Sequence, residues 1–208
     1  MATSMTTVIQ PTAFKDFPFT ETMTRDAFWN LYRPGSVEHL ILHNLRNSTS
    51  YCPELDLVAL IENEVVGHII STKAKVVDVH NTEHEILCVG PLSVLQAFQK
   101  KGIGSALMNH SILIAKQLGF SGMILFGNPD YYHRFGFKNA QEYNITTKEG
   151  HNFEPFMALE LQADGLTHIS GRFMEDNAFE VKPEDIDAFD KNFPYKEKKV
   201  TNTQLNNL

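Results

Sequence analysis

The stretch from Ile86 to Phe126 limits the fold more than any other part of the sequence. It opens with an apolar run of strand character, Ile86–Leu95, which the pair Gly90-Pro91 interrupts. Such a break inside a strand predicts a bulge, where backbone groups leave the ladder and become available to a ligand. Apolar residues then recur at helical spacing from Gly102 onward, and a second strand closes the unit. We therefore expect two parallel strands joined by a right-handed helical crossover.

The segments around this unit predict further helices and strands. Two apolar runs separated by Glu62-Asn63-Glu64 indicate a β-hairpin. The expected helices cover residues 21–32, a segment capped by Ser36, and residues 183–189; the expected strands cover residues 55–61, 65–79 and 156–161. Since no repeat or low-complexity linker is present, Asp164-Gly165 is the best boundary. We expect one domain at 1–163 and a C-terminal extension at 164–208 that packs on the core or trails it.

Net charge and residue usage exclude several classes of partner. The chain carries 18 Lys plus Arg against 25 Asp plus Glu, a formal charge of −7. Sequence-independent binding to nucleic acid depends on cations that neutralise phosphates, so we expect no nucleic-acid partner and only a local basic site. No run reaches the ~18–20 apolar residues of a spanning helix. Cys52 and Cys88 lack partners at metal-ligand spacing. We expect a cytoplasmic protein with no membrane partner and no metal.

The turn Gln99–Ala106 carries the clearest chemical signal. A helix start exposes unpaired N–H groups and the positive end of the helix dipole, which together favour a phosphate or pyrophosphate. Glycines 102 and 104 let a ligand approach without a Cβ in the way. A Walker loop would need a Lys after the glycines, and none is present. A dinucleotide fingerprint would need a small residue where the chain has Leu107, so a dinucleotide enzyme is the weakest alternative.

The remaining pattern resembles the GCN5-related N-acetyltransferases (GNAT family). Gln-x-x-Gly-x-Gly after a broken strand is similar to the family's pyrophosphate loop. Gly90–Val94 resembles its bulged strand, and Tyr131–Phe137 resembles its closing Tyr-x-x-x-Gly-Phe segment. Residues 27–35 and 170–173 are similar to the predicted acetyltransferases of the YhbS type. The resemblance is specific from residue 85 to 137 and looser elsewhere.

The resemblance implies an α/β fold with a mixed sheet, the GNAT acyl-CoA N-acyltransferase fold, whose central strands splay apart near Val94 and Phe126. Acetyl-CoA would enter that opening, with its pantetheine along the first strand and its pyrophosphate on the glycine-bearing turn. The two lysines of the turn either contact CoA phosphates or are solvated charges. The cofactor-binding residues implied in this way are Leu92, Ser93, Val94, Gln99, Lys100, Lys101, Gly102, Ile103, Gly104, Ser105, Asn128 and Tyr131.

The same resemblance assigns catalytic roles. The backbone N–H of Val94 would polarise the thioester carbonyl. Tyr132 occupies the position of the general acid that protonates the departing thiolate, although the tyrosine before it is an alternative. Some family members place a Glu in the bulged strand, where this chain has Cys88. Glu85, with His84, could instead act as the base through a water relay, and the alternative is proton loss to a water wire or to bulk solvent.

The predicted activity is transfer of an acetyl group from acetyl-CoA to a primary amine, by direct attack in a ternary complex without a covalent enzyme intermediate. The alternative is a catalytically weak or inactive CoA-binding or regulatory module. The acceptor would be a small-molecule or peptide amine, and the surplus of carboxylates suits a cationic one. Phe28, Trp29 and Tyr32 either belong to the core or line an acceptor pocket. A homodimer is compatible with the sequence.

Overall fold

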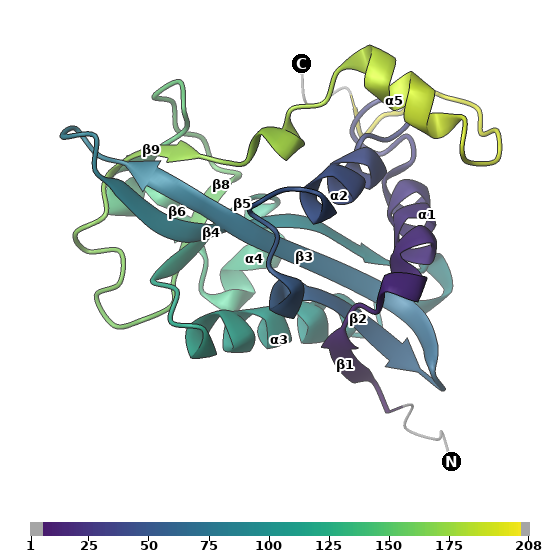
Figure 1. The fold of residues 1–208 in the computed structure, drawn as a ribbon, viewed down its shortest axis with the longest axis horizontal. Coiled ribbons are helices and arrows are strands. Elements are labelled where there is room, and N and C mark those ends of the chain that lie inside the picture. The colour runs from purple at the N-terminus through teal and green to yellow at the C-terminus, as the bar shows by residue number, and fades with distance from the viewer. Residues whose placement is uncertain (1–5, 205–208) are drawn as a thin grey trace.

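The computed structural model describes residues 6–204 and arranges them around one nine-stranded mixed sheet (Figure 1). The main path through the sheet is β1-β2-β3-β4-β5-β8-β6, while β9 pairs with both β3 and β7. Strands β4 and β5 are parallel, and helix α3 connects them. The structure therefore confirms the expected mixed α/β sheet and its central crossover.

The bounds of the elements are as follows. The strands are β1 (Val8–Pro11), β2 (Asp56–Ile61), β3 (Glu64–Val77), β4 (Glu83–Val94), β5 (Gly122–Phe126), β6 (Lys138–Asn139), β7 (Ile145–Thr146), β8 (Phe156–Glu160) and β9 (Gly171–Met174). The α-helices are α1 (Phe17–Phe28), α2 (Glu38–Arg46), α3 (Ile103–Gln117), α4 (Pro129–Tyr132) and α5 (Pro183–Asp190).

The expected hairpin and most long elements are confirmed, but α1 differs from its prediction. Residues 62 and 63 have φ values of 51° and 66°, the left-handed pair that tight hairpin turns require. The sequence spacing predicts a first helix that runs to residue 32, yet α1 ends at Phe28 and Trp29 is extended. Asn30 follows in the left-handed region with φ 59°, and its side chain accepts a hydrogen bond from Gly35 N. Residues 29–37 therefore form a looped connection to α2.

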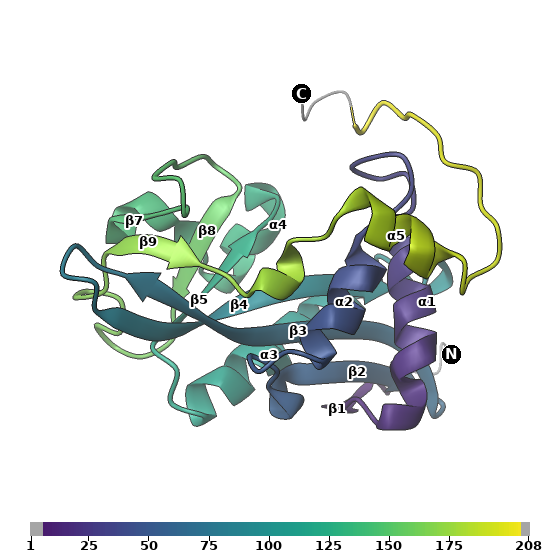
Figure 2. The same cartoon turned by 45° about the horizontal axis from the view of Figure 1, so that its top comes forward.

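Helices cover both faces of the sheet (Figure 2). Helix α3 packs on one face through a large apolar core that includes Leu57, Ile69, Leu87 and Leu107. On the opposite face, α1 contacts β4 and β3, and α2 packs beside it. This arrangement leaves the C-terminal ends of β4 and β5 between α3 on one face and α1 and α2 on the other.

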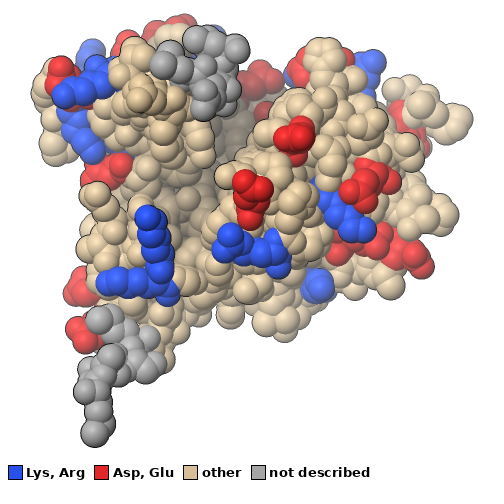
Figure 3. Space-filling model, turned by 180° about the vertical axis from the view of Figure 1, so that it is seen from behind, with Lys and Arg blue, Asp and Glu red and all other residues tan. Residues whose placement is uncertain are grey.

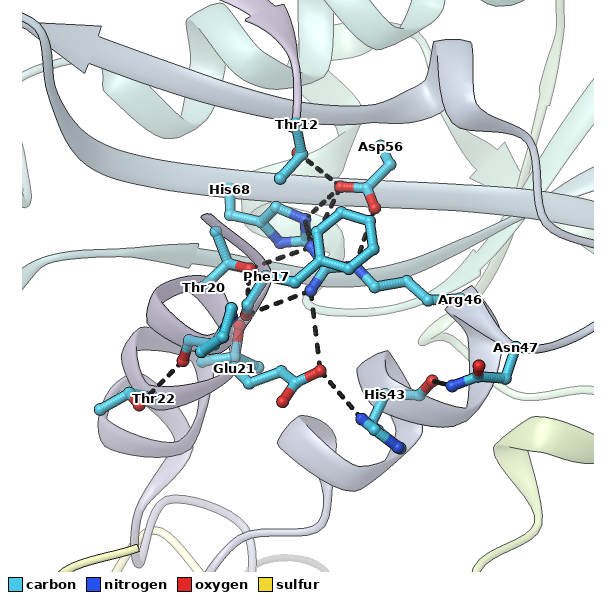
Figure 4. A network of polar contacts seen from close by, with 12 residues as sticks. Thr12, Phe17, Thr20, Glu21, Thr22, His43, Arg46, Asn47, Asp56 and His68 are labelled. Carbon is cyan, nitrogen blue, oxygen red and sulfur yellow. Dashed lines mark hydrogen bonds and ion pairs between the residues drawn. The ribbon is translucent and has the colours of Figure 1, made fainter. Parts of the chain in front are cut away.

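A buried polar network ties α1 and α2 to the sheet (Figure 4). Arg46 of α2 donates to both carboxylate oxygens of Asp56, at 2.8 and 3.3 Å, and His68 lies 2.7 Å from the same group. Burial alone would raise the pKa of Asp56, but the hydrogen bonds and charges of His68 and Arg46 outweigh it and hold that pKa well below its usual range. Arg46 also donates to Thr20 of α1 at 3.0 Å. The ionised Asp56 is thus held by partners on several elements.

The segment 164–208, expected as an extension, contributes directly to the sheet and the helical layer as far as residue 204. Strand β9 lies antiparallel to the end of β3, and the chain then crosses to α2 before it enters α5 (Figure 2). Arg25 of α1 donates to Asp190 of α5 at 2.9 Å. Residues beyond α5 run back to the connection after α1, where Asn30 O accepts from Thr201 and Gln204.

Candidate active site

A cleft opens where β4 and β5 part. The two strands pair only at Leu87 with Met123 and Cys88 with Ile124, although β4 continues to Val94. The space beyond is a cavity of about 890 Å³. The molecule is visibly hollowed on the face shown in Figure 3, with Lys and Arg side chains on either side of the hollow. The expected splaying of the central strands near Val94 and Phe126 is therefore present.

A bulge in β4 accompanies the opening. Ser71 pairs with Val89 and Ile69 pairs with Leu92, so Gly90 and Pro91 together face one residue of β3. Space favours glycine at position 90, because a Cβ there would lie 3.0 Å from the Ile70 side chain and 3.2 Å from Leu45. The bulge predicted from the Gly-Pro pair is confirmed.

The bulged half of β4 presents backbone donors to the cleft. Leu95 N–H donates to Val66 O at 2.9 Å, toward β3. Since successive N–H groups of a strand point to opposite edges, the N–H groups of Val94 and Leu92 point to the edge that β5 has left. Ser93 lies between them, is 2 % exposed, and has its hydroxyl oxygen 3.1 Å from that of Thr24. The open edge thus offers donors at Leu92 and Val94, and Ser93 has its polar groups engaged elsewhere.

The first turn of α3 lies beside this edge and has no side-chain cap. Gly102 occupies the N-cap position with φ 84°, a left-handed conformation that suits glycine. The N–H groups of Ile103, Gly104 and Ser105 precede the first intrahelical hydrogen bond, which Ala106 N donates to Gly102 O. These uncapped donors and the dipole form an anion-binding helix start next to the cleft.

Glycine 104 keeps that helix start open. A Cβ added there would lie 2.9 Å from the Tyr131 hydroxyl oxygen and 3.8 Å from the Val94 side chain. Tyr131 therefore reaches across the cleft from α4 and rests above the turn. The Ile103 side chain is 3 % exposed and belongs to the main core, so only its backbone is available to a ligand.

Tyr132 lies deeper in the cleft wall. Its ring packs over Gly127, where an added Cβ would collide with the ring, and contacts the rings of Phe135 and Phe137. Burial, assisted by the neighbouring Tyr131 and Tyr32 phenols, raises the pKa of Tyr132. A phenol with a raised pKa stays protonated and remains able to donate a proton at neutral pH.

The other predicted cofactor contacts divide into two groups. Gln99 and Asn128 line the cavity, but both already hold backbone groups: Gln99 donates to Val94 O at 3.2 Å, and the Asn128 side chain accepts from Asp130 N at 2.9 Å. Lys100 and Lys101 are exposed at the turn and do not line the cavity. Lys101 stacks its amino group 5.2 Å from the centre of the Phe98 ring.

The structure does not bring the predicted base to the cleft. Glu85 is exposed on the far half of β4, where it pairs with Lys73 at 3.4 Å. Three residues of strand, roughly 10 Å, separate it from Cys88 at the point where the cleft begins. His84 lies 3.2 Å from Asp78 and is not in the cavity wall either. Glu85 therefore lies outside the cavity wall, and its role as a base acting through a water relay stays a prediction.

Sequence reasoning missed residues of the cavity wall that come from distant segments. Glu38 and Ile41 of α2 line it, as do Glu175 after β9 and Phe179 after the crossing to α2. Such positions follow no local motif, because they depend on how α2 and the chain after β9 pack over the sheet. Phe28, Leu31 and Tyr32 also line the cavity, whereas Trp29 does not.

No cluster of metal-ligating side chains exists among residues 6–204, and no helix in that part of the chain is long and apolar enough to cross a membrane. The cleft combines an unpaired strand edge, an uncapped helix start and a half-buried phenol. That arrangement suits a ligand that has an amide-bearing arm and a pyrophosphate.

The fold and this site define an acyltransferase of the GNAT class. The family model described as "Acetyltransferase (GNAT) family" matches residues 20–137, more than half of the chain, and the chain belongs to that family. The resemblance found in the sequence is thereby confirmed.

Individual relatives agree with this classification. The uncharacterized N-acetyltransferase YhbS of Escherichia coli (strain K12) is 24% identical over 157 residues, which cover 75% of this chain and 88% of that protein. The crystal structure of YhbS from Escherichia coli, in complex with CoA, superposes with a TM-score of 0.76 at 20% identity, covering 87% of this chain and 96% of that one. A GNAT family acetyltransferase from Brucella melitensis, in complex with acetyl-CoA, gives a TM-score of 0.68 at 26% identity and covers 84% and 99%.

Proposed function

We propose that the protein transfers an acetyl group from acetyl-CoA to a primary amine, by direct attack of the amine in a ternary complex. The observation that carries the proposal is the unpaired edge of β4 beside the uncapped start of α3 in one cavity. Two related structures contain CoA or acetyl-CoA, which supports the choice of co-substrate.

The residues present fit this co-substrate. The N–H groups of Leu92 and Val94 can pair with the amides of a pantetheine arm as a neighbouring strand would. The N–H groups of residues 103–105 can hold the pyrophosphate, and the missing Cβ at Gly104 leaves room for it. Bound acetyl-CoA supplies the acetyl group as an activated thioester.

The chain's own groups then act on charge and protons. The Val94 N–H is fixed in the sheet and can donate to an oxygen on which negative charge develops, at no cost of reorganisation. Tyr132 remains protonated because its pKa is raised, and it can give its proton to a departing thiolate. No nucleophilic side chain is needed, since the amine itself attacks.

The test is incubation with acetyl-CoA and a panel of primary amines, with release of free thiol as the measurement. Amine-dependent thiol release supports the proposal. If CoA binds and no amine causes release, the protein is instead a CoA-binding module. The family resemblance supports that alternative, because it implies a Glu in some members where this chain has Cys88. Stabilisation against heat by NAD(P) and not by CoA would identify a dinucleotide protein and refute both.

A further inference from the structure

The charges inside the cleft have one sign. Of the residues in its wall, which all belong to the described part of the chain, the formally charged ones are Glu38 and Glu175; no Lys, Arg, Asp or His is among them. Carboxylates in a partly enclosed wall attract a cation and repel an anion. The part of the cleft wall that contains Glu38 and Glu175 therefore favours an ammonium group over an anion.

Glu38 already has a structural role. One of its carboxylate oxygens accepts hydrogen bonds from Ser36 Oγ and Val37 N, both at 2.9 Å, where α2 begins. A carboxylate near a helix N-terminus also interacts favourably with the helix dipole.

Glu175 is held differently. It follows β9 directly, and its carboxylate makes no hydrogen bond or ion pair with any other residue between 6 and 204. The next residue is anchored, because Asp176 accepts from Ser48 at 2.6 Å, from Ser50, and from Ala178 N at 2.7 Å. The backbone around Glu175 is thus fixed by the sheet on one side and by the chain after α2 on the other.

The surroundings of Glu175 raise its pKa toward neutral pH but leave most of the carboxylate ionised at pH 7. Partial burial raises the pKa of Glu175 to about 6, with help from the charges of Glu180 and Glu149 and against that of Lys148. Burial, together with Glu175 and Asp176, raises the pKa of the Cys88 thiol well above its usual value, so the thiol stays protonated. The charged and titratable groups around Glu175 and along the nearby wall are Asp176, Glu180, Lys148, Glu149, Cys88, Glu38, Tyr32 and Tyr132.

We propose that Glu175 takes the proton from the ammonium form of the acceptor, and that the acceptor is a primary amine with an apolar or aromatic body. This inference rests on the proposed acetyltransferase activity. Side chains suited to such a body line the same cavity: Phe28, Leu31, Ile41, Phe126 and Phe179. The anchored backbone of Glu175 holds the carboxylate at this wall while its outer side stays open to solvent.

The proton balance of the step is complete. The ammonium proton moves to Glu175, and the neutral nitrogen forms a bond to the acyl carbon as the carbon–sulfur bond breaks. Tyr132 gives its proton to the sulfur and recovers one from the nitrogen, which carries a surplus proton after attack. Glu175 then releases its proton to solvent. Ammonium and thioester become amide, thiol and one free proton.

The test compares wild-type protein with Glu175→Gln, Glu175→Asp and Glu184→Gln. Glu184 is exposed on α5 and lies outside the cleft, so its substitution matches the charge change without touching the wall. With 2-phenylethylamine at pH 7, kcat/KM should fall about 100-fold in Glu175→Gln, recover in part in Glu175→Asp, and remain unchanged in Glu184→Gln. With 4-methoxyaniline, whose nitrogen is unprotonated at neutral pH, Glu175→Gln should match wild type.

The pH profile separates a proton acceptor from a merely structural residue. Wild-type kcat/KM for 2-phenylethylamine should rise through a pH of about 6 and then level off, whereas Glu175→Gln should climb steadily up to the pKa of the amine itself. If wild type releases thiol and Glu175→Gln keeps both its rate and the limb near pH 6, this inference is wrong while the acetyltransferase activity stands. Absence of thiol release by wild type with every amine would overturn both. Faster turnover of acidic or strongly polar amines would refute the acceptor class.

Discussion

Substitution of Gly104 by Ala should make the protein more stable and weaken its binding of CoA. Gly104 is the second residue of α3, in a helical conformation where alanine is preferred to glycine by up to ~1 kcal/mol. The added Cβ would lie 2.9 Å from the Tyr131 hydroxyl oxygen, which is the far end of a side chain that can move aside. The clash therefore costs the fold little, and the thermal midpoint should rise by about 1–3 °C.

The same methyl group would stand in front of the donors that the pyrophosphate uses, and it would push Tyr131 into the cleft. Loss of one hydrogen bond to a charged group costs about 1.5–3 kcal/mol. That range corresponds to a Kd for CoA weakened about 10- to 150-fold. Titration calorimetry with CoA and thermal unfolding without it measure the two effects on the same samples.

Asn109→Ala is the matched control. Asn109 is exposed on α3, so alanine there also raises helix propensity but leaves the first turn untouched. This variant should gain stability and bind CoA as wild type does. If Gly104→Ala binds CoA within twofold of wild type, the first turn of α3 is not the phosphate site and the reasoning from its free N–H groups fails.

Three further outcomes are expected. Tyr132→Phe should lower kcat by about 10²-fold or more with little change in thermal midpoint, because the phenol acts on the leaving group while the ring keeps its packing; an unchanged kcat would remove Tyr132 from the mechanism. Arg46→Met leaves the buried Asp56 without its arginine partner. The free energy of unfolding should therefore fall by about 3–5 kcal/mol and the thermal midpoint by about 6–20 °C. The double variant Arg46→Met/Asp56→Asn should recover part of this loss. Burial lowers the pKa of His39 to about 4 despite the charge of Asp190, so the folded state disfavours the protonated ring; stability should fall as pH drops from about 6.5 to about 4, and urea titrations of His39→Gln should show a smaller fall.

Sequence patterns predicted the part of the site proposed to bind acetyl-CoA far better than the part proposed to bind the amine. The glycine-bearing turn, the Gly-Pro break and the tyrosine pair are local in sequence, and each produces its structure through short-range backbone geometry. Glu175 comes within reach of Cys88 only because β9 joins the edge of β3 and the chain then crosses to α2. No spacing in the sequence indicates such a long-range contact.

The bulge also limits what alternation can predict. Val89 and Leu92 both belong to or pack against the α3 side of the core, although they are three residues apart and a regular strand would place them on opposite faces. The alternation of residues between the two faces of the sheet is shifted by one residue at Gly90-Pro91. The residues whose N–H groups face the cleft can therefore be assigned only after the bulge has been located. Strand β9 was missed because only four residues form it, without a clear apolar alternation.

The return of the chain to Asn30 links residues 199–204 to the connection that follows α1. The backbone and side chain of Asn30 accept hydrogen bonds from Lys199, Thr201 and Gln204, and the connection it holds continues into Leu31 and Tyr32 of the cleft wall. Substitutions among residues 199–204 should therefore shift Leu31 and Tyr32 in the cleft wall.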